Sequence, residues 1–356
     1  MRIALVAPPF IPVPPICYGG TELFVAHLAE GLERMGHDVV VYANGESTVT
    51  AELRWYYPKT MWPPAGNISE TLKEVTHTAW AIRDASETCD VIHLNNMFGL
   101  PYSRFVDVPF VCTIHHPHEE MLTEFYCGYP KVRYITISEH CRRREPMPHV
   151  RTIHHGINIS QYKFSEKKQP YLSFLGRIVP VKGVHSAIAI AKKTGIPLKI
   201  AGEVQPMFRD YFEREIVPQI DGRFIEYIGE ADFKTKNELL SNSLALLFPI
   251  EWDEPFGLIM IEAMACGTPV LALPRGSVPE VVQDGVSGYI CSSVGQMGDR
   301  VADLSKLKPS AIRQYALERF SVEKMASAYA ALYSEIAGDK ALGQLNKLVG
   351  IEHPLA

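Results

Sequence analysis

The stretch Glu254-Pro-Phe-Gly-Leu-Ile-Met-Ile-Glu262 places two carboxylates eight residues apart around a Pro-Phe-Gly turn, and Ala-Met-Ala-Cys-Gly-Thr-Pro-Val follows it. The pattern predicts an apolar helix and then a buried strand. Glu254 then lies in the loop before the helix, and Glu262 lies on its second turn. Such carboxylates can accept hydrogen bonds from sugar or ribose hydroxyls. The amides of Gly257 and Leu258 favour an anion at the helix N-terminus, so the stretch predicts a site for a sugar attached to a phosphate.

Short apolar runs alternate with helical patterns on both sides of this stretch. The alternation predicts an α/β fold with parallel sheets and helices on both faces, in two doubly wound domains. The runs interpreted as strands are Arg2–Ala7, Asp38–Tyr42, Asp90–Leu94, Pro109–Ile114, Tyr134–Ile137, Tyr171–Leu175, Leu198–Ala201, Phe224–Tyr227, Ala245–Phe248 and Pro269–Leu273.

The domain boundary is expected near the polar segment Asn158–Pro170, which divides the chain into residues 1–160 and residues 161–336. A last helix at about 337–356 could pack back on the first domain. The first helix is expected to begin at Thr21, which can cap its N-terminus, and to end at Gly36.

Composition excludes several classes of protein. The 356 residues carry a net charge of −5, whereas a nucleic-acid binder usually has a basic face. The apolar run at the N-terminus is too short for a signal peptide, and no run of about 18 apolar residues could span a membrane. The basic cluster Arg142–Arg144 is too small for stable membrane association. Seven scattered cysteines indicate reduced thiols in a cytoplasmic protein.

One loop follows the first strand of each half, at the carboxyl end of the strand, where open parallel sheets bind their ligands. Gly19 and Gly20 lead into a helix and could let backbone amides approach a phosphate, although a tight turn would need glycines as well. Arg177 and Lys182 flank the second loop and suit a diphosphate, although they could also be solvated surface charges.

A histidine-rich segment, Thr113-Ile-His-His-Pro-His118, follows another predicted strand. No further ligand stands at a suitable spacing, so no metal site is predicted. His115 directly follows the strand and could hydrogen-bond a sugar hydroxyl as a neutral imidazole, or it could be a packing residue. His116 and His118 fit packing better.

Taken together, the motifs resemble those of the family 4 retaining glycosyltransferases, which have the GT-B fold of two Rossmann-like domains facing a central cleft. The resemblance covers nearly the whole chain, and the motifs occur in the family's order. They are Tyr18-Gly-Gly-Thr-Glu22, His115, His155-Gly-Ile-Asn158, Gly176-Arg177 with Lys182-Gly183, Glu254 to Glu262, and Gly276-Ser-Val-Pro-Glu280 with Asp284-Gly-Val-Ser-Gly288. The family often has Asp where this chain has Asn158.

The resemblance implies that the first domain binds the acceptor and the second binds a nucleotide sugar. It implies catalytic roles for His115, Glu254, Arg177 and Lys182, with donor contacts from Gly19, Gly20, Arg177, Lys182, Glu254, Phe256, Gly257, Leu258 and Glu262. Glu262 would accept from the ribose hydroxyls and Glu254 from the donor sugar. Arg177 and Lys182 would hold the diphosphate.

The implied activity is hexose transfer with retention of configuration, glucose from UDP-glucose being favoured. The chain has no Asp-x-Asp motif, so neither a metal nor another cofactor is expected. The acceptor would be a small molecule or a saccharide, with candidate contacts from Tyr18, Trp62, Asn95, Phe98 and His116. Two alternatives stay open: an inverting GT-B enzyme with His115 or Glu119 as the base, and a non-catalytic protein that binds sugar nucleotides.

Overall fold

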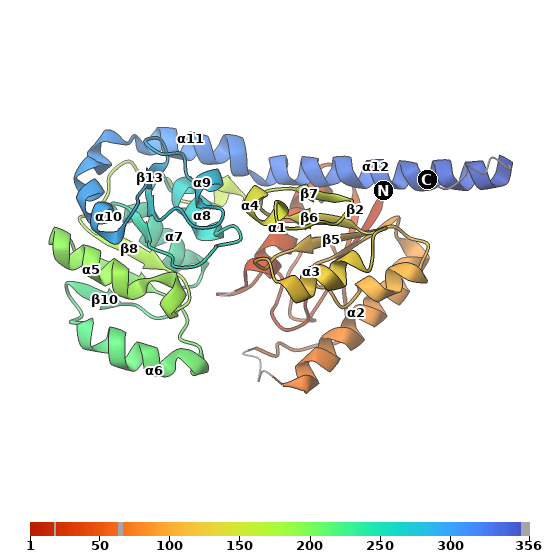
Figure 1. Ribbon diagram of the computed structural model, residues 1–356, viewed down its shortest axis with the longest axis horizontal. Coiled ribbons are helices and arrows are strands. Elements are labelled where there is room, and N and C mark those ends of the chain that lie inside the picture. The colour runs from red at the N-terminus through yellow and green to blue at the C-terminus, as the bar shows by residue number, and fades with distance from the viewer. Residues whose placement is uncertain (18, 63–66, 350–356) are drawn as a thin grey trace.

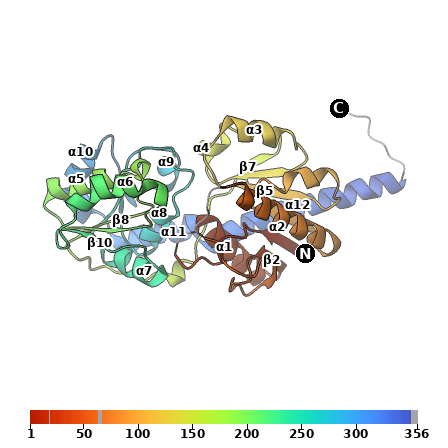
Figure 2. The same ribbon diagram turned by 90° about the horizontal axis from the view of Figure 1, so that it is seen from below.

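A computed structural model describes residues 1–17, 19–62 and 67–349, with side chains as far as residue 338. Within these residues the chain forms two parallel β-sheets, each covered by helices on both faces (Figure 1). The same two lobes lie side by side when seen from below (Figure 2). The expected α/β fold with two Rossmann-like halves is therefore confirmed.

The first half contains a seven-stranded sheet in the order β3-β2-β1-β4-β5-β6-β7. Helices α1 and α12 bury apolar residues against one face, and α2 and α3 bury theirs against the other. The elements are β1 (Arg2–Val6), α1 (Gly20–Arg34), β2 (Asp38–Ala43), β3 (Glu52–Trp55), α2 (Ile68–Thr88), β4 (Val91–Leu94), η1 (Leu100–Arg104), β5 (Phe110–Ile114), α3 (Glu120–Cys127), β6 (Arg133–Thr136), α4 (Glu139–Arg142), β7 (Val150–Thr152) and η2 (Ile159–Gln161).

The second half contains a six-stranded sheet in the order β10-β9-β8-β11-β12-β13. Its strands are almost entirely apolar because both faces are covered. The elements are β8 (Leu172–Leu175), η3 (Pro180–Lys182), α5 (Val184–Thr194), β9 (Leu198–Ala201), η4 (Pro206–Phe208), α6 (Arg209–Tyr211), η5 (Phe212–Ile216), η6 (Val217–Gln219), β10 (Ile225–Tyr227), α7 (Phe233–Asn242), β11 (Leu246–Phe248), α8 (Leu258–Ala265), β12 (Val270–Ala272), α9 (Val278–Val281), β13 (Gly288–Ile290), α10 (Val294–Arg300), η7 (Val301–Lys306) and α11 (Pro309–Phe320).

Each sheet reverses its strand order next to its first strand. The reversal falls between β1 and β4 in the first sheet and between β8 and β11 in the second. Loops on the two sides of such a reversal diverge and leave a crevice at the carboxyl ends of the strands. The fold therefore brings the loops after β1 and β8 to the two places where a ligand can bind.

The chain returns to the first half at Ser321, directly before α12 (Val322–Val349). The amide of Ile157 donates to the carbonyl of Phe320, and the amide of Val322 donates to the carbonyl of Ile157, so both crossings between the halves lie side by side. Residues 322–336 then pack in the core of the first half. We expected 161–336 in the second half and a returning helix only at 337–356, so the return begins earlier than predicted.

Helix α12 lies along α1, as Figure 1 shows at the top of the first half. Gly31 of α1 permits this contact, because a Cβ atom there would lie 2.6 Å from Cβ of Ala326. No helix of the described residues is long and apolar enough to cross a membrane.

Three strands were not predicted, namely β3, β7 and β13. All three are edge strands of three or four residues. Charged residues interrupt β3 and β7, and β13 is only Gly-Tyr-Ile, so none shows a long apolar run. Helix α1 also begins earlier than expected. Gly19 is its N-cap and Thr21 lies inside it, so the prediction of Thr21 as the cap was wrong.

Candidate active site

A cavity of about 490 Å³ lies between the two halves. Residues from both sheets line it, mostly from loops at the carboxyl ends of the strands. Among them are Gly19, Gly20, His115, His116 and His155 from the first half, and Arg177, Lys182, Glu203, Lys236, Trp252, Glu254, Phe256, Gly257, Leu258 and Glu262 from the second. All the expected catalytic and donor-binding residues therefore gather in one place.

The loop after β8 brings Lys182 next to Glu254. Gly183 has the left-handed φ of 75°, and a Cβ atom there would lie 2.1 Å from the carbonyl oxygen of Pro249. Only glycine allows this approach. The amide of Glu251 also donates to the carbonyl of Val181 at 2.8 Å, which fixes the two loops together.

Glu254 is buried and is held through one oxygen. Its Oε2 accepts from Nζ of Lys182 at 2.5 Å and from Nε1 of Trp252 at 2.8 Å. The Lys182 ammonium also lies over the Trp252 ring, 4.8 Å from its centroid. These contacts fix the Glu254 carboxylate near the N-terminus of α8 and keep the Lys182 ammonium beside it.

Glu262 lies on α8 and is the more buried carboxylate of the two, with 3% exposure against 8% for Glu254. Its Oε1 accepts from Nζ of Lys236 at 2.5 Å and from the hydroxyl of Tyr162 at 2.9 Å. Lys236 comes from α7, and its side chain is 13% exposed. A buried carboxylate needs such partners, because an unpaired charge away from water is costly.

The N-terminus of α8 faces the same cavity. Gly257 is its N-cap with a φ of 77°, and a Cβ atom there would lie 2.8 Å from Cε of Met260. The first amides of the helix have no partner inside it and carry partial positive charge. Gly20 lies opposite, since a Cβ atom on it would be 3.8 Å from Cδ1 of Leu258, so the two halves nearly meet here.

His115 lies at the carboxyl end of β5 and is oriented by Asn95. Strand β4 lies between β1 and β5, so Asn95 can reach both neighbours. Its Nδ2 donates to the carbonyl of Val6 at 3.1 Å, which turns Oδ1 toward Nε2 of His115 at 2.9 Å. Nε2 therefore carries the proton and Nδ1 is left as an acceptor. Burial lowers the pKa of His115 to about 3, with a smaller contribution from His116, so the imidazole is neutral.

The expected acceptor contacts are spread more widely. His116 lines the cavity, and its ring bonds to the Tyr126 hydroxyl at 2.6 Å. Trp62 donates from Nε1 to Oε1 of Glu203 at 3.3 Å and so reaches across to the second half. Trp62, Asn95 and Phe98 are not among the described residues that line the cavity, and Tyr18 lies outside the described residues.

Sequence reasoning missed two residues of the cavity, Lys236 and Trp252, and it missed Tyr162, which contacts Glu262. It quoted His155 within a motif but gave it no role. Trp252 stands two residues before Glu254, and this proximity was a usable signal. Lys236 and Tyr162 carried none, because they meet Glu262 only in the folded chain. His155 stacks on His115 with ring centroids 5.5 Å apart, and no described residue bonds to its buried Nδ1.

Two parallel α/β halves around a cleft with paired carboxylates and cations define a GT-B protein. Two family models match the chain, one for each half. "Glycosyltransferase Family 4" matches residues 18–161, and "Glycosyl transferases group 1" matches residues 157–318. The chain belongs to the family 4 glycosyltransferases, and it is a glycosyltransferase enzyme.

Relatives and solved structures agree with this assignment. The glycogen synthase of Mycobacterium tuberculosis (strain ATCC 25618 / H37Rv) is 24% identical over 94% of this chain and 94% of its own length. The sucrose-phosphate synthase from Thermosynechococcus elongatus has a TM-score of 0.79 at 18% identity, covering 95% of this chain and 99% of that one. Anabaena HepE in complex with UDP-glucose has a TM-score of 0.74 at 19% identity, covering 94% and 100%. The two structural likenesses show the fold.

Proposed function

We propose that this enzyme transfers a hexose from a nucleotide sugar, with UDP-glucose favoured, to a hydroxyl of a small-molecule or saccharide acceptor. Configuration is retained and no metal takes part. One observation carries the proposal. Lys182 and Arg177 share a cavity with the buried carboxylates Glu254 and Glu262 and with the N-terminus of α8. That set matches a diphosphate between two rings that bear hydroxyl groups.

Negative charge develops on the diphosphate as the glycosyl–phosphate bond breaks. Fixed cations and helix N-termini stabilise such charge most when they are already in place before the reaction. Lys182 is held by Glu254 and Trp252, so its ammonium needs little reorganisation. These groups are the proposed substitute for a divalent cation, in a chain that has no Asp-x-Asp motif.

Retention is favoured over inversion by the state of His115. An inverting enzyme needs a base near the acceptor hydroxyl. A group whose pKa is about 3 takes up a proton poorly at neutral pH, and Glu119, the other nominee, is exposed and does not line the described cavity. In the proposed same-face substitution, the C–O bond to phosphate breaks and a C–O bond to the acceptor forms. The acceptor's proton passes to the leaving phosphate oxygen.

The donor and the cell compartment are also part of the proposal. HepE, a neighbour in fold, was solved with UDP-glucose, which supports the same class of donor here. The seven cysteines are free thiols, which fits a reducing cytoplasm. The acceptor would enter from the first half, past His116, and neither nucleic acid nor a stable membrane contact is expected.

A single transfer assay tests these statements. UDP-glucose and a panel of saccharide and small-molecule acceptors are incubated with the enzyme in EDTA, and fresh product is analysed by proton NMR. We expect undiminished transfer and an α-linked product, recognised by the small anomeric coupling. A β-linked product would show inversion, and loss of activity restored by magnesium or manganese would show that a metal is needed.

A further inference from the structure

Glu262 is held through only one of its two carboxylate oxygens. Lys236 and Tyr162 both donate to Oε1, at 2.5 and 2.9 Å. No described residue donates to Oε2. A carboxylate oxygen has two lone pairs, so two donors fill the capacity of Oε1. The whole acceptor capacity of Oε2 is left for a ligand in the cavity that Glu262 lines.

Lys236 is not an ordinary surface lysine. Its side chain is 13% exposed, that of Glu262 is 4% exposed, and the ammonium lies 5.7 Å from the Phe233 ring centroid. Burying both charges is tolerated because they pair and because Tyr162 adds a neutral donor. Without the ammonium, Glu262 would be a buried carboxylate with one hydrogen bond, and its orientation would no longer be fixed.

Glu254 repeats the same arrangement. A lysine ammonium and an aromatic N–H, from Lys182 and Trp252, converge on Oε2, and no described residue donates to Oε1. Two carboxylates in one cavity thus each combine a cation, an aromatic donor and one unused oxygen. Both carboxylates are buried and line the same cavity, so a ligand there can reach the two unused oxygens.

We propose that Lys236 and Tyr162 are positioning residues that aim Oε2 of Glu262 at a ribose hydroxyl of the donor, and that they thereby make the enzyme select ribonucleotides over deoxyribonucleotides. The inference rests on the proposed function, since it needs a nucleotide in the cavity. A deoxyribose would leave Oε2 buried and without a donor. Sites built to bond a hydroxyl reject analogues that lack it for this reason.

The test is calorimetric titration with UDP, 2′-deoxy-UDP and 3′-deoxy-UDP. The proteins are the unmodified enzyme, Lys236→Met, Tyr162→Phe, Lys236→Arg and the matched control Lys234→Met, which removes an exposed lysine from the same helix. The unmodified enzyme should bind UDP about tenfold more tightly than at least one deoxy analogue, the effect of one hydrogen bond to a charged group. Lys236→Met should lose that preference, because its affinity for UDP should fall while its affinity for the deoxy analogue stays the same. Lys236→Arg should keep most of it, and Lys234→Met all of it.

Tyr162→Phe should show a smaller loss of the same kind, and it keeps the test decisive if Lys236→Met melts at a lower temperature. If Lys236→Met binds UDP and both analogues more weakly by the same factor, the lysine acts on the phosphates. That result would overturn the inference but leave the proposed function standing. Equal binding of all three nucleotides by the unmodified enzyme would overturn it too. An enzyme that binds no nucleoside diphosphate would overturn the proposed function as well.

Discussion

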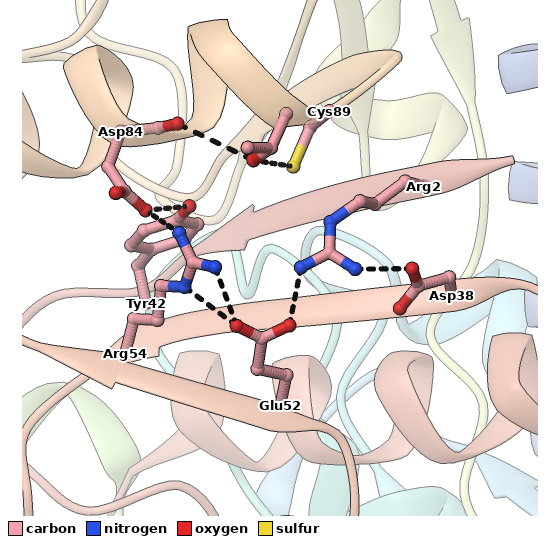
Figure 3. Close-up of polar contacts among 8 residues, drawn as sticks. Arg2, Asp38, Tyr42, Glu52, Arg54, Asp84 and Cys89 are labelled. Carbon is pink, nitrogen blue, oxygen red and sulfur yellow. Dashed lines mark hydrogen bonds and ion pairs between the residues drawn. The ribbon is translucent and has the colours of Figure 1, made fainter.

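Two groups of charged side chains, one in each half, use their carboxylates differently. The first is the amino-end network, made of Arg2, Asp38, Glu52, Arg54 and Asp84 with the Tyr42 hydroxyl (Figure 3). Arg2, Asp38 and Glu52 are the first residues of β1, β2 and β3. The second group is the pair of cleft carboxylates, Glu254 and Glu262.

In the amino-end network, both oxygens of Glu52 are occupied. Oε1 accepts from Arg54 at 2.8 Å and Oε2 accepts from Arg2, as Figure 3 shows. In Glu254 and Glu262, described residues fill one oxygen of each carboxylate, and no described residue donates to the other. The amino-end side chains are also partly exposed, with Glu52 at 41%, whereas Glu262 is at 4%. Asp38 and Asp84 in the amino-end network accept on Oδ2 alone, so the exposure of the side chains, and not the number of filled oxygens, separates the two groups. A partly exposed network joins strands, while a buried pair of carboxylates that lines a cavity is suited to a ligand.

The largest effect is expected from removing a cleft cation. Arg177→Ala and Lys182→Ala should each lower kcat/KM, because each variant lacks a cation that is proposed to face the leaving diphosphate. The fall should correspond to a loss of about 2–4 kcal/mol of transition-state stabilisation. Steady-state kinetics with UDP-glucose measures the loss. Arg54→Ala is the control from the amino-end network and should leave kcat/KM unchanged. Unchanged kinetics in both cleft variants would remove the distinction between the two groups.

The sequence predicted the fold well because buried parallel strands appear as continuous apolar runs, as in Leu198–Ala201. It also predicted the residues on the loops after β1, β5 and β8, since the carboxyl ends of parallel strands are where such sheets bind their ligands. It could not predict Lys236 and Tyr162. These residues lie 26 and 100 positions from Glu262 along the chain, and only folding brings them to its carboxylate. Strand β3 was missed because it carries the charged residues of the amino-end network.

An intermediate effect is expected from Glu22, a buried carboxylate that has no cation. It lies on the first turn of α1, is 5% exposed and receives no hydrogen bond from another described residue. Burial raises its pKa to about 7, and the charge of Glu74 adds to this. Between about pH 4.5 and 7 the unfolded chain loses this proton before the folded one does, so stability falls as pH rises through that window.

Glu22→Gln removes this penalty. The variant should be about 1–3 kcal/mol more stable than the unmodified enzyme at about pH 8 and nearly equal to it at about pH 5. Urea unfolding at the two pH values measures the difference. Glu87→Gln, an exposed change on α2, should show no such pH dependence. If Glu22→Gln is instead less stable at both pH values, the carboxylate has a partner and resembles the cleft pair.

The smallest effect is expected from Arg54→Ala in the amino-end network. Arg54 and its partners are 29–41% exposed, so water and salt screen their attraction, and the free energy of unfolding should fall by only about 0.5–1 kcal/mol. The difference should shrink further at about 1 M sodium chloride, where charges are screened within roughly 3 Å. Arg223→Ala removes an exposed arginine for which no described carboxylate is a partner, and it serves as the control. A loss above about 2 kcal/mol that salt does not reduce would show that the amino-end network behaves as a buried one, and exposure would then no longer separate it from the cleft.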